Sequence, residues 1–232
     1  MRKITLSAML VAGMLGLGFI MSSAQMESEA GPERTRVLKS VEVFKELLAL
    51  PEHGIPPALL HKAQAIAIIP GFIKAAYVVG GEHGKGVIAV RHANGEWSDP
   101  AFISMTGGSL GFQVGVEKAD IFLVFKDRDS VETIDQGKFT LGGSASVAAG
   151  PVGRSAQAST DINFEAEVYS YSKAKGIFAG ISINGAALRM DKGANERFYQ
   201  KFGIKVDDIL YKNPQAPNEA RELKDILNKN AK

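Results

Sequence analysis

The distribution of glycine is the feature that constrains this chain most. Fifteen of its 25 glycines lie between Gly71 and Gly153, where they separate short runs of β-branched, aromatic and other apolar residues. Short apolar runs bounded by glycine turns are typical of antiparallel β-structure. The pattern predicts strands over residues 65–69, 75–79, 87–90, 101–105, 110–116, 121–125, 138–148, 162–171 and 176–183.

Glycine pairs and one asparagine–glycine step predict the turns between the first of these strands. Turns are expected at Gly80-Gly81, at residues 93–95 and at Gly107-Gly108. Asn94-Gly95 is the strongest hairpin signal, because both residues accept positive φ. The chain lacks the alternation of strands and helices that marks a doubly wound fold, and its Gly-Gly pairs are unequally spaced, unlike a repeat array. We therefore expect one curved or partly closed antiparallel sheet.

Helical patterns flank this glycine-rich region on both sides. Apolar residues at spacings of four, three and four predict an amphipathic helix from residue 36, with Val37, Val41, Phe44 and Leu48 on one face. Pro57 suits the first turn of a short helix that ends at Lys62 or Gln64. Further helices are expected over residues 194–201, 206–211 and 219–227. The predicted fold class is α+β, with an N-terminal helix and C-terminal helices packed on the sheet.

The N-terminal helix carries cations and carboxylates together on its polar side. An amphipathic helix with cations can lie on a membrane surface, and it can equally cover an open face of a sheet. The mixed charge favours packing on the core.

The first 24 residues have the pattern of a secretory signal peptide. Arg2 and Lys3 precede an uncharged stretch over residues 4–21, and Ser22-Ser23-Ala24 supplies small residues at a cleavage site. The alternative is an uncleaved membrane anchor, because 18 residues can marginally span a bilayer. We expect export to the periplasm or cell surface, then a flexible segment 25–34, a domain 35–212 and a helical tail 213–232.

Charge and cysteine content exclude several classes of function. Cleavage after residue 24 removes two of the 27 lysines and arginines and none of the 25 acidic residues, so the mature chain is close to neutral. A bulk basic field for nucleic acid is therefore not supported. The chain has no cysteine, which excludes disulfides, thiolate metal sites, cysteine nucleophiles and a lipid-modified cysteine anchor.

Two serine motifs resemble those of hydrolases but lack their context. Residues 107–111 match G-x-S-x-G around Ser109, yet all four histidines precede this serine, and the nucleophile elbow requires the histidine to follow. Ser170 and Lys173 match S-x-x-K without the companion motifs of penicillin-recognising enzymes. We predict a glycine-rich turn at the first motif and no catalytic residue at either.

Metal and nucleotide motifs are incomplete as well. The histidine spacings fit no short metal-binding motif, and Asp127-Arg128-Asp129 starts like a calcium loop but lacks its later acceptors, which favours a solvated charged turn. Residues 80–86 lack the P-loop spacing, although glycine amides beside Lys85 can form an anion nest. We predict neither a metal nor a cofactor.

Several of these segments, taken together and in order, resemble the SYLF domain family. The resemblance extends from about residue 39 to residue 202, and its matching segments are 68–70, 80–86, 95–102, 107–113, 141–153 and 169–180. It implies lipid binding, especially of phosphoinositides in eukaryotic relatives, actin binding in some relatives, and no established catalysis. It also implies membrane contact through an amphipathic N-terminal segment, which corresponds here to residues 34–48. An exported chain would not meet actin.

The first functional hypothesis is non-enzymatic binding of anionic lipid or a membrane surface. Cations beside glycine turns are the candidates to hold phosphate, and they are Lys74, Lys85, Arg154, Lys173 and Lys175. Lys173 and Lys175 are two residues apart, so on one strand they would project from the same face. The alternatives are a serine hydrolase that uses Ser109 or Ser170, and a structural or assembly protein of the cell envelope.

Overall fold

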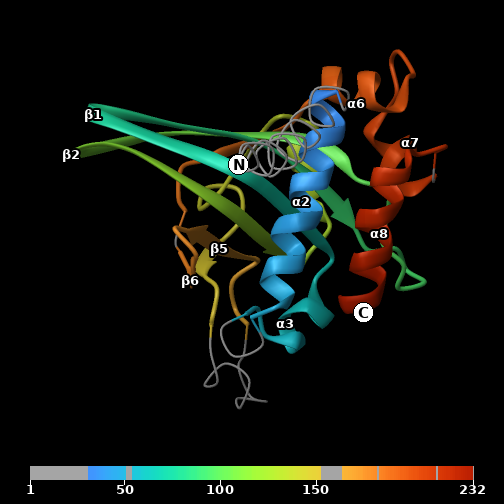
Figure 1. Cartoon of the computed structure of the whole chain (residues 1–232), viewed down its shortest axis with the longest axis horizontal. Coiled ribbons are helices and arrows are strands. Elements are labelled where there is room, and N and C mark those ends of the chain that lie inside the picture. The colour runs from blue at the N-terminus through green and yellow to red at the C-terminus, as the bar shows by residue number, and fades with distance from the viewer. Residues whose placement is uncertain (1–30, 51–53, 153–163, 182, 213, 232) are drawn as a thin grey trace, which may run out of the picture.

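The computed structural model describes residues 31–50, 54–152, 164–181, 183–212 and 214–231. These residues form a curled, mostly antiparallel sheet of seven strands with helices packed around it (Figure 1). The predicted α+β class, with a curved sheet between an N-terminal helix and C-terminal helices, is confirmed.

Two long strands dominate the sheet. β1 (Ala65–Val90) pairs antiparallel with β2 (Ala101–Phe125), in a register that runs from Ala65 opposite Phe125 to Ile88 opposite Ala101. The prediction of six short strands here, divided by glycine turns, is wrong. Gly80 pairs with Ser109, and Gly81 pairs with Gly108, within one continuous ladder. The glycines therefore bend the ribbon instead of ending its strands.

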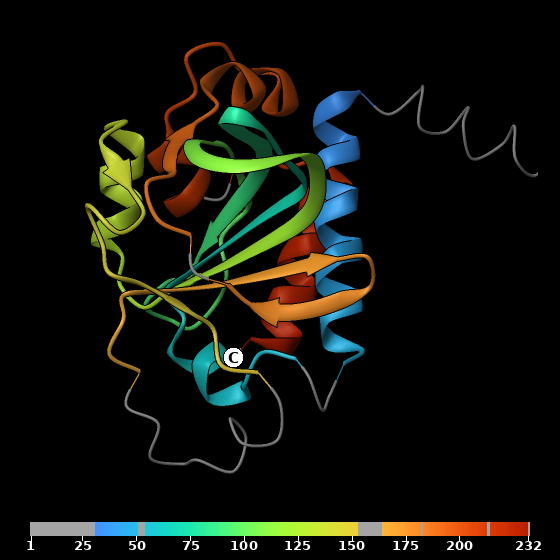
Figure 2. The same ribbon diagram turned by 90° about the vertical axis from the view of Figure 1, so that its left-hand side faces the viewer.

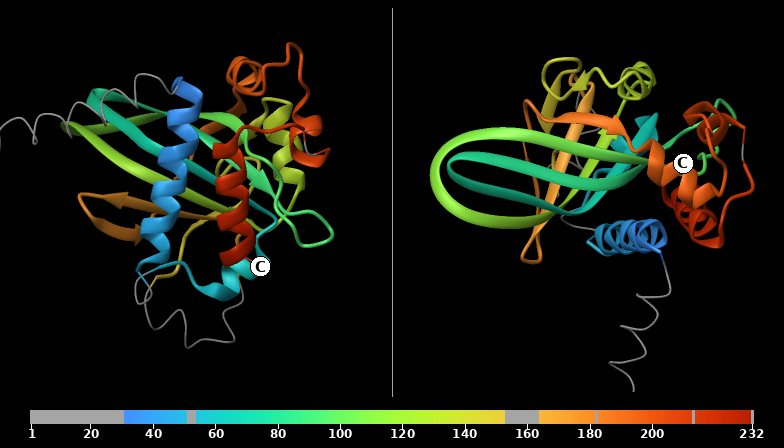
Figure 3. Two further views of the ribbon diagram at one scale, coloured as in Figure 1. Left: turned by 45° about the vertical axis from the view of Figure 1, so that its right-hand side comes forward. Right: turned by 90° about the horizontal axis from the view of Figure 1, so that it is seen from above.

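The β1–β2 ribbon folds over on itself, as Figure 3 shows from above. Gly84 and Gly86 lie where the second half of β1 crosses its first half. A Cβ atom on Gly86 would overlap the carbonyl oxygen of Ile68 and lie 2.8 Å from the Cα atom of Ile69. The missing side chains thus allow two backbone segments to approach closely. At Pro70-Gly71, where a strand end was predicted, the ladder continues through an irregularity in register.

Shorter strands extend the sheet on both sides of β2. β7 (Ala187–Met190) pairs with one half of β2 and with β3 (Phe139–Thr140), while β5 (Val168–Ala174) pairs with the other half. β6 (Ile177–Gly180) pairs antiparallel with β5, and β4 (Val147–Ala149) pairs parallel with β5. The single strand predicted over residues 138–148 is therefore two short strands, and β7 was not predicted.

The helices lie close to their predicted positions, with one addition. They are α2 (Pro32–Leu48), α3 (Pro57–Lys62), α4 (Asp129–Asp135), α6 (Lys192–Tyr199), α7 (Val206–Tyr211) and α8 (Asn218–Asn230). α4 was not predicted; it begins at Asp129, the last residue of the predicted charged turn 127–129. The Asp127 carboxylate accepts a hydrogen bond from the Ser130 backbone N–H in the first turn of this helix. α2 begins four residues earlier than predicted, with Pro32 in its first turn.

The predicted packing of the N-terminal helix on the core is confirmed. Val37, Val41 and Phe44 are buried, and the Phe44 ring stacks on Phe122 of β2 with 5.7 Å between centroids. α8 lies beside α2 on the same side of the folded ribbon (Figures 1 and 2). No helix in the described part of the chain is long and apolar enough to cross a membrane.

The loop between β1 and β2 holds the end of α8. Trp97 is fully buried, and its indole N–H donates to the Ala231 carbonyl oxygen at 2.8 Å. The Arg91 guanidinium lies 5.0 Å from the Trp97 ring and donates to the carbonyl oxygens of Leu60 and Ala231. This contact places Asp99, two residues after Trp97, against the first turns of α8.

Candidate functional site

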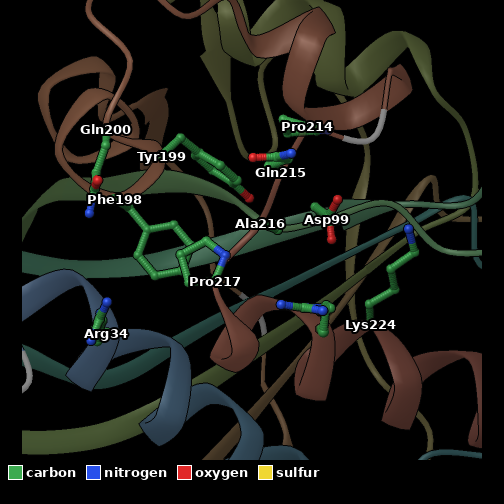
Figure 4. Close-up of a pocket in the computed structure, with 11 residues that line it drawn as sticks. Arg34, Asp99, Phe198, Tyr199, Gln200, Pro214, Gln215, Ala216, Pro217 and Lys224 are labelled. Atoms are coloured by element: carbon green, nitrogen blue, oxygen red, sulfur yellow. The ribbon is translucent and has the colours of Figure 1, made fainter.

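A surface depression of about 730 Å³ lies between the start of α2 and the start of α8 (Figure 4). Its walls come from the first turn of α2, the end of α6, the segment before α8 and the start of α8. The lining residues are Arg34, Asp99, Phe198, Tyr199, Gln200, Pro214, Gln215, Ala216, Pro217, Arg221 and Lys224.

Three cationic side chains line this depression. Arg221 and Lys224 are three residues apart on α8, so they project from one face of the helix. Arg34 enters from α2, and its Nε atom lies 3.9 Å from the Glu219 carboxylate. Arg221 donates to the Asn218 side-chain oxygen at 2.7 Å. Both contacts hold the guanidinium groups beside the depression.

Asp99 is the single carboxylate among the lining residues, and it is 3% exposed. Burial raises the pKa of the Asp99 carboxyl group, and the nearby charges of Lys224, Arg221 and His92 offset only part of this increase. Positive charge therefore predominates in the depression, and it increases when Asp99 takes up a proton.

Aromatic and proline side chains form the apolar part of the walls. The Tyr199 hydroxyl donates to the Pro100 carbonyl oxygen at 2.7 Å, and burial raises the pKa of this hydroxyl well above its usual value. The Phe198 ring packs edge-on against Phe102 at 5.0 Å. Both rings are thus fixed by the core, and the depression combines a rigid apolar wall with cations at its edge.

The structure does not bring the predicted lysines together. Lys85 lies 3.7 Å from the Asp191 carboxylate. This carboxylate also forms an ion pair with Arg36 and accepts a hydrogen bond from the Ala194 backbone N–H at the start of α6. Burial raises the pKa of Asp191, but that hydrogen bond and the two cations together bring it below its ordinary value. Lys85 therefore helps to neutralise the Asp191 carboxylate at the start of α6.

Lys74 lines a separate cavity of about 350 Å³, together with residues of β2 and β5. It sits opposite Glu117 in the β1–β2 register, and Glu82 lines the same cavity. Carboxylates outnumber cations there, so this environment does not favour an anion.

The prediction that Lys173 and Lys175 share a strand face is wrong. Lys173 forms an ion pair with Glu46 of α2. Lys175 lies beyond the end of β5, in the two-residue turn that it makes with Gly176, and both residues have positive φ. Arg154 lies outside the described residues.

Ser170 does not have the surroundings of a nucleophile. Ser170 is buried, and its hydroxyl donates to the Ile181 carbonyl oxygen, with the Ala148 carbonyl oxygen as a more distant acceptor at 3.3 Å. Lys173 is an odd number of residues from Ser170 on β5 and so projects from the other face. Ser109 pairs with Gly80 inside a strand, where a glycine-rich turn was predicted, and its side chain lies outside the described set. No cluster of three potential metal ligands occurs among the described residues.

Sequence reasoning missed the depression because its residues are distant in the chain. The i, i+3 spacing of Arg221 and Lys224 was visible, but it is common on solvated helices. What distinguishes this pair is that α8 packs between the start of α2 and Asp99.

Comparison with known proteins shows the family. The model of the Ysc84 family, described as "Las17-binding protein actin regulator", matches residues 106–230. The chain belongs to this family, which is the SYLF family. The SYLF chain is 35% identical over 195 residues to SH3 domain-containing YSC84-like protein 1 of Xenopus laevis, covering 82% of this chain and 58% of that protein. The human protein of the same name is 33% identical over 198 residues, covering 84% and 57%.

A yeast relative is more similar over a shorter stretch. LAS seventeen-binding protein 3 of Saccharomyces cerevisiae strain S288c is 43% identical over 148 residues, which is 62% of the SYLF chain and 32% of the yeast protein. The SYLF chain thus spans less than two thirds of the length of these relatives.

Proposed function

We propose that this SYLF chain binds the phosphate groups of anionic lipids in the depression, without catalysing a reaction. The observation that carries this proposal is the convergence of Arg34, Arg221 and Lys224 on one site, where Asp99 is the single carboxylate among the lining residues and Glu219 lies beside Arg34. Guanidinium groups bind phosphate through two parallel hydrogen bonds, and a lysine adds a mobile point charge.

The shape of the depression favours a head group over a whole lipid. The apolar wall consists of Phe198, Tyr199 and a few proline and alanine carbons, which offers little surface for acyl chains. A head group can therefore enter while its acyl chains stay in the bilayer. The family resemblance supports lipid binding in general, but it does not point to these residues.

The yeast relative is named for binding to a protein partner, Las17, and the family model is described as "Las17-binding protein actin regulator". We do not extend these partners to the SYLF chain, because we propose that residues 1–24 direct its export. An exported protein meets lipid surfaces but not cytoplasmic actin.

The double substitution Arg221→Gln and Lys224→Gln tests the site. Each cation near an anionic surface contributes roughly 1 kcal/mol, so the pair should change affinity about 30-fold. We expect vesicles of phosphatidylcholine and phosphatidylglycerol to float with the wild-type protein, and the variant to bind them about 30-fold more weakly. Circular dichroism checks that the variant is folded.

A matched control uses two cations from the sequence hypothesis. Lys74→Gln with Lys175→Gln removes the same charge outside the depression, and we expect binding to stay close to that of the wild type. If the control loses binding while the depression variant retains it, the site proposed here is wrong. If the wild type does not bind anionic vesicles at all, the proposed function itself is wrong.

A further inference from the structure

Phe202 is the most exposed of the large apolar side chains that the structure describes, at 94%. It occupies the turn between α6 and α7. The Ile204 backbone N–H donates to the Lys201 carbonyl oxygen at 3.3 Å, and Gly203 follows Phe202 with a φ of +68°. This is the pattern of a type II turn with glycine in its required position.

Contacts with α6 and with the core fix the conformation of this turn. The Gly203 N–H donates to the Glu196 carboxylate at 2.9 Å, and Ile204 is buried. Fixing a large apolar ring in water gives no folding stability, since burial is what makes such a ring favourable. The braced turn nevertheless holds Phe202 outward, which suggests that the ring meets another surface.

The turn adjoins the cationic depression. Gln200, two residues before Phe202, lines the depression and ends α6 with a φ of +51°. Lys201 before Phe202 and Lys205 after it in the chain are both exposed. Asp208 of α7, which Lys201 also influences, is paired with Lys212 at 2.8 Å.

We propose that the turn 201–205 docks the protein on an anionic bilayer, with the Phe202 ring inserted at the level of the lipid head groups. Aromatic rings favour this interfacial zone, and flanking lysines attract anionic lipid. This proposal rests on the proposed function, because the same contact would present head groups to the depression.

Another exposed apolar site offers a rival docking face. Ile177, 72% exposed, follows the Lys175-Gly176 turn between β5 and β6. Among the described residues, Lys175 in that turn is the one cation beside it, because Lys173 is already paired with Glu46. The cavity that adjoins the hairpin at Ser172 and Ile181 is lined by Glu82 and Glu117 and by Lys74 alone among cations, so it does not favour an anion. We therefore expect the α6–α7 turn, and not this hairpin, to reach the membrane.

Two matched substitutions separate these faces. Phe202→Ser should weaken binding to phosphatidylglycerol-containing vesicles about tenfold, through the loss of apolar burial. Ile177→Ser should leave that binding unchanged. Both variants should bind water-soluble glycerol 3-phosphate like the wild type, measured by nuclear magnetic resonance titration, whereas Arg221→Gln with Lys224→Gln should not.

Fluorescence quenching gives an independent test of insertion. Phe202→Trp should be quenched by vesicles whose acyl chains are brominated, while the native Trp97, which is fully buried, should not be quenched in the wild-type protein. No quenching beyond the wild type, or unchanged vesicle binding by Phe202→Ser, would overturn the docking proposal. If the wild type does not bind anionic vesicles at all, the proposed function fails as well.

Discussion

A single methyl group at residue 86 tests how the ribbon folds. In Gly86→Ala the new Cβ atom would meet the backbone of Ile68 and Ile69, neither of which can rotate away. We expect the free energy of unfolding to fall by about 3 kcal/mol, as in other overpacked cores. Urea denaturation followed by circular dichroism measures this change.

Gly81→Ala is the matched control, because no atom lies within 4 Å of the position of its Cβ atom. We expect its free energy of unfolding to stay within about 0.5 kcal/mol of the wild type. Equal losses of unfolding free energy in Gly86→Ala and Gly81→Ala would contradict the inference that Gly86 is needed for the close crossing within β1.

Asp99 should make lipid binding depend on pH. Its pKa is raised above the ordinary value by burial, so the carboxyl group takes up a proton as pH falls through that raised pKa. The carboxylate then no longer opposes an anion, and vesicle binding should strengthen towards acidic pH. In Asp99→Asn this dependence should be lost and binding should stay strong at neutral pH.

The stability of the folded state should also increase towards acidic pH. Between the ordinary and the raised pKa of Asp99 the folded chain binds more protons than the unfolded chain, so this contribution to stability falls as pH rises through that window. Flotation and urea denaturation over a pH series check both effects. An Asp99→Asn variant that keeps the full pH dependence of binding would contradict this role.

At the scale of elements, amphipathic helices were predictable and strand continuity was not. The apolar spacing of Val37, Val41 and Phe44 depends on local sequence, and α2 buries that face as expected. Gly80-Gly81 is typical of a turn when it is considered locally. It stays in a strand because the backbone of residues 108 and 109 supplies its hydrogen-bonded partner, and that partner cannot be inferred from residues 80 and 81 alone.

The attachment of α8 depends on the loop before β2. Trp97→Phe removes the indole N–H that donates to Ala231, so we expect the free energy of unfolding to fall by about 1–2 kcal/mol. Hydrogen exchange should also quicken in α8 more than in β1. Tyr211→Phe, which removes a hydroxyl group from a more exposed ring, serves as the control. An unchanged urea midpoint in Trp97→Phe would contradict this account.

At the scale of the whole molecule, the fold class followed from sequence but the candidate site did not. Glycine-rich strands between two helical regions were enough to predict a curved sheet with helices on it. The predicted lysines were chosen because glycine lay beside them in sequence, and Lys85 and Lys173 turned out to neutralise Asp191 and Glu46. The depression requires the packing of α2, α6 and α8, which no local pattern contains.

The pairing of α2 with α8 also determines when the depression can exist during synthesis. Lys45 of α2 contacts Glu222 of α8, 177 residues later, whereas the β1–β2 ribbon is one contiguous hairpin. A growing chain therefore completes the ribbon long before α8 is synthesised. The cationic site forms only after α8 has brought Arg221 and Lys224 next to Arg34. A partly made or truncated chain can hold a formed sheet and still lack the cationic site, so under the proposed function lipid capture would report that the last helix has docked.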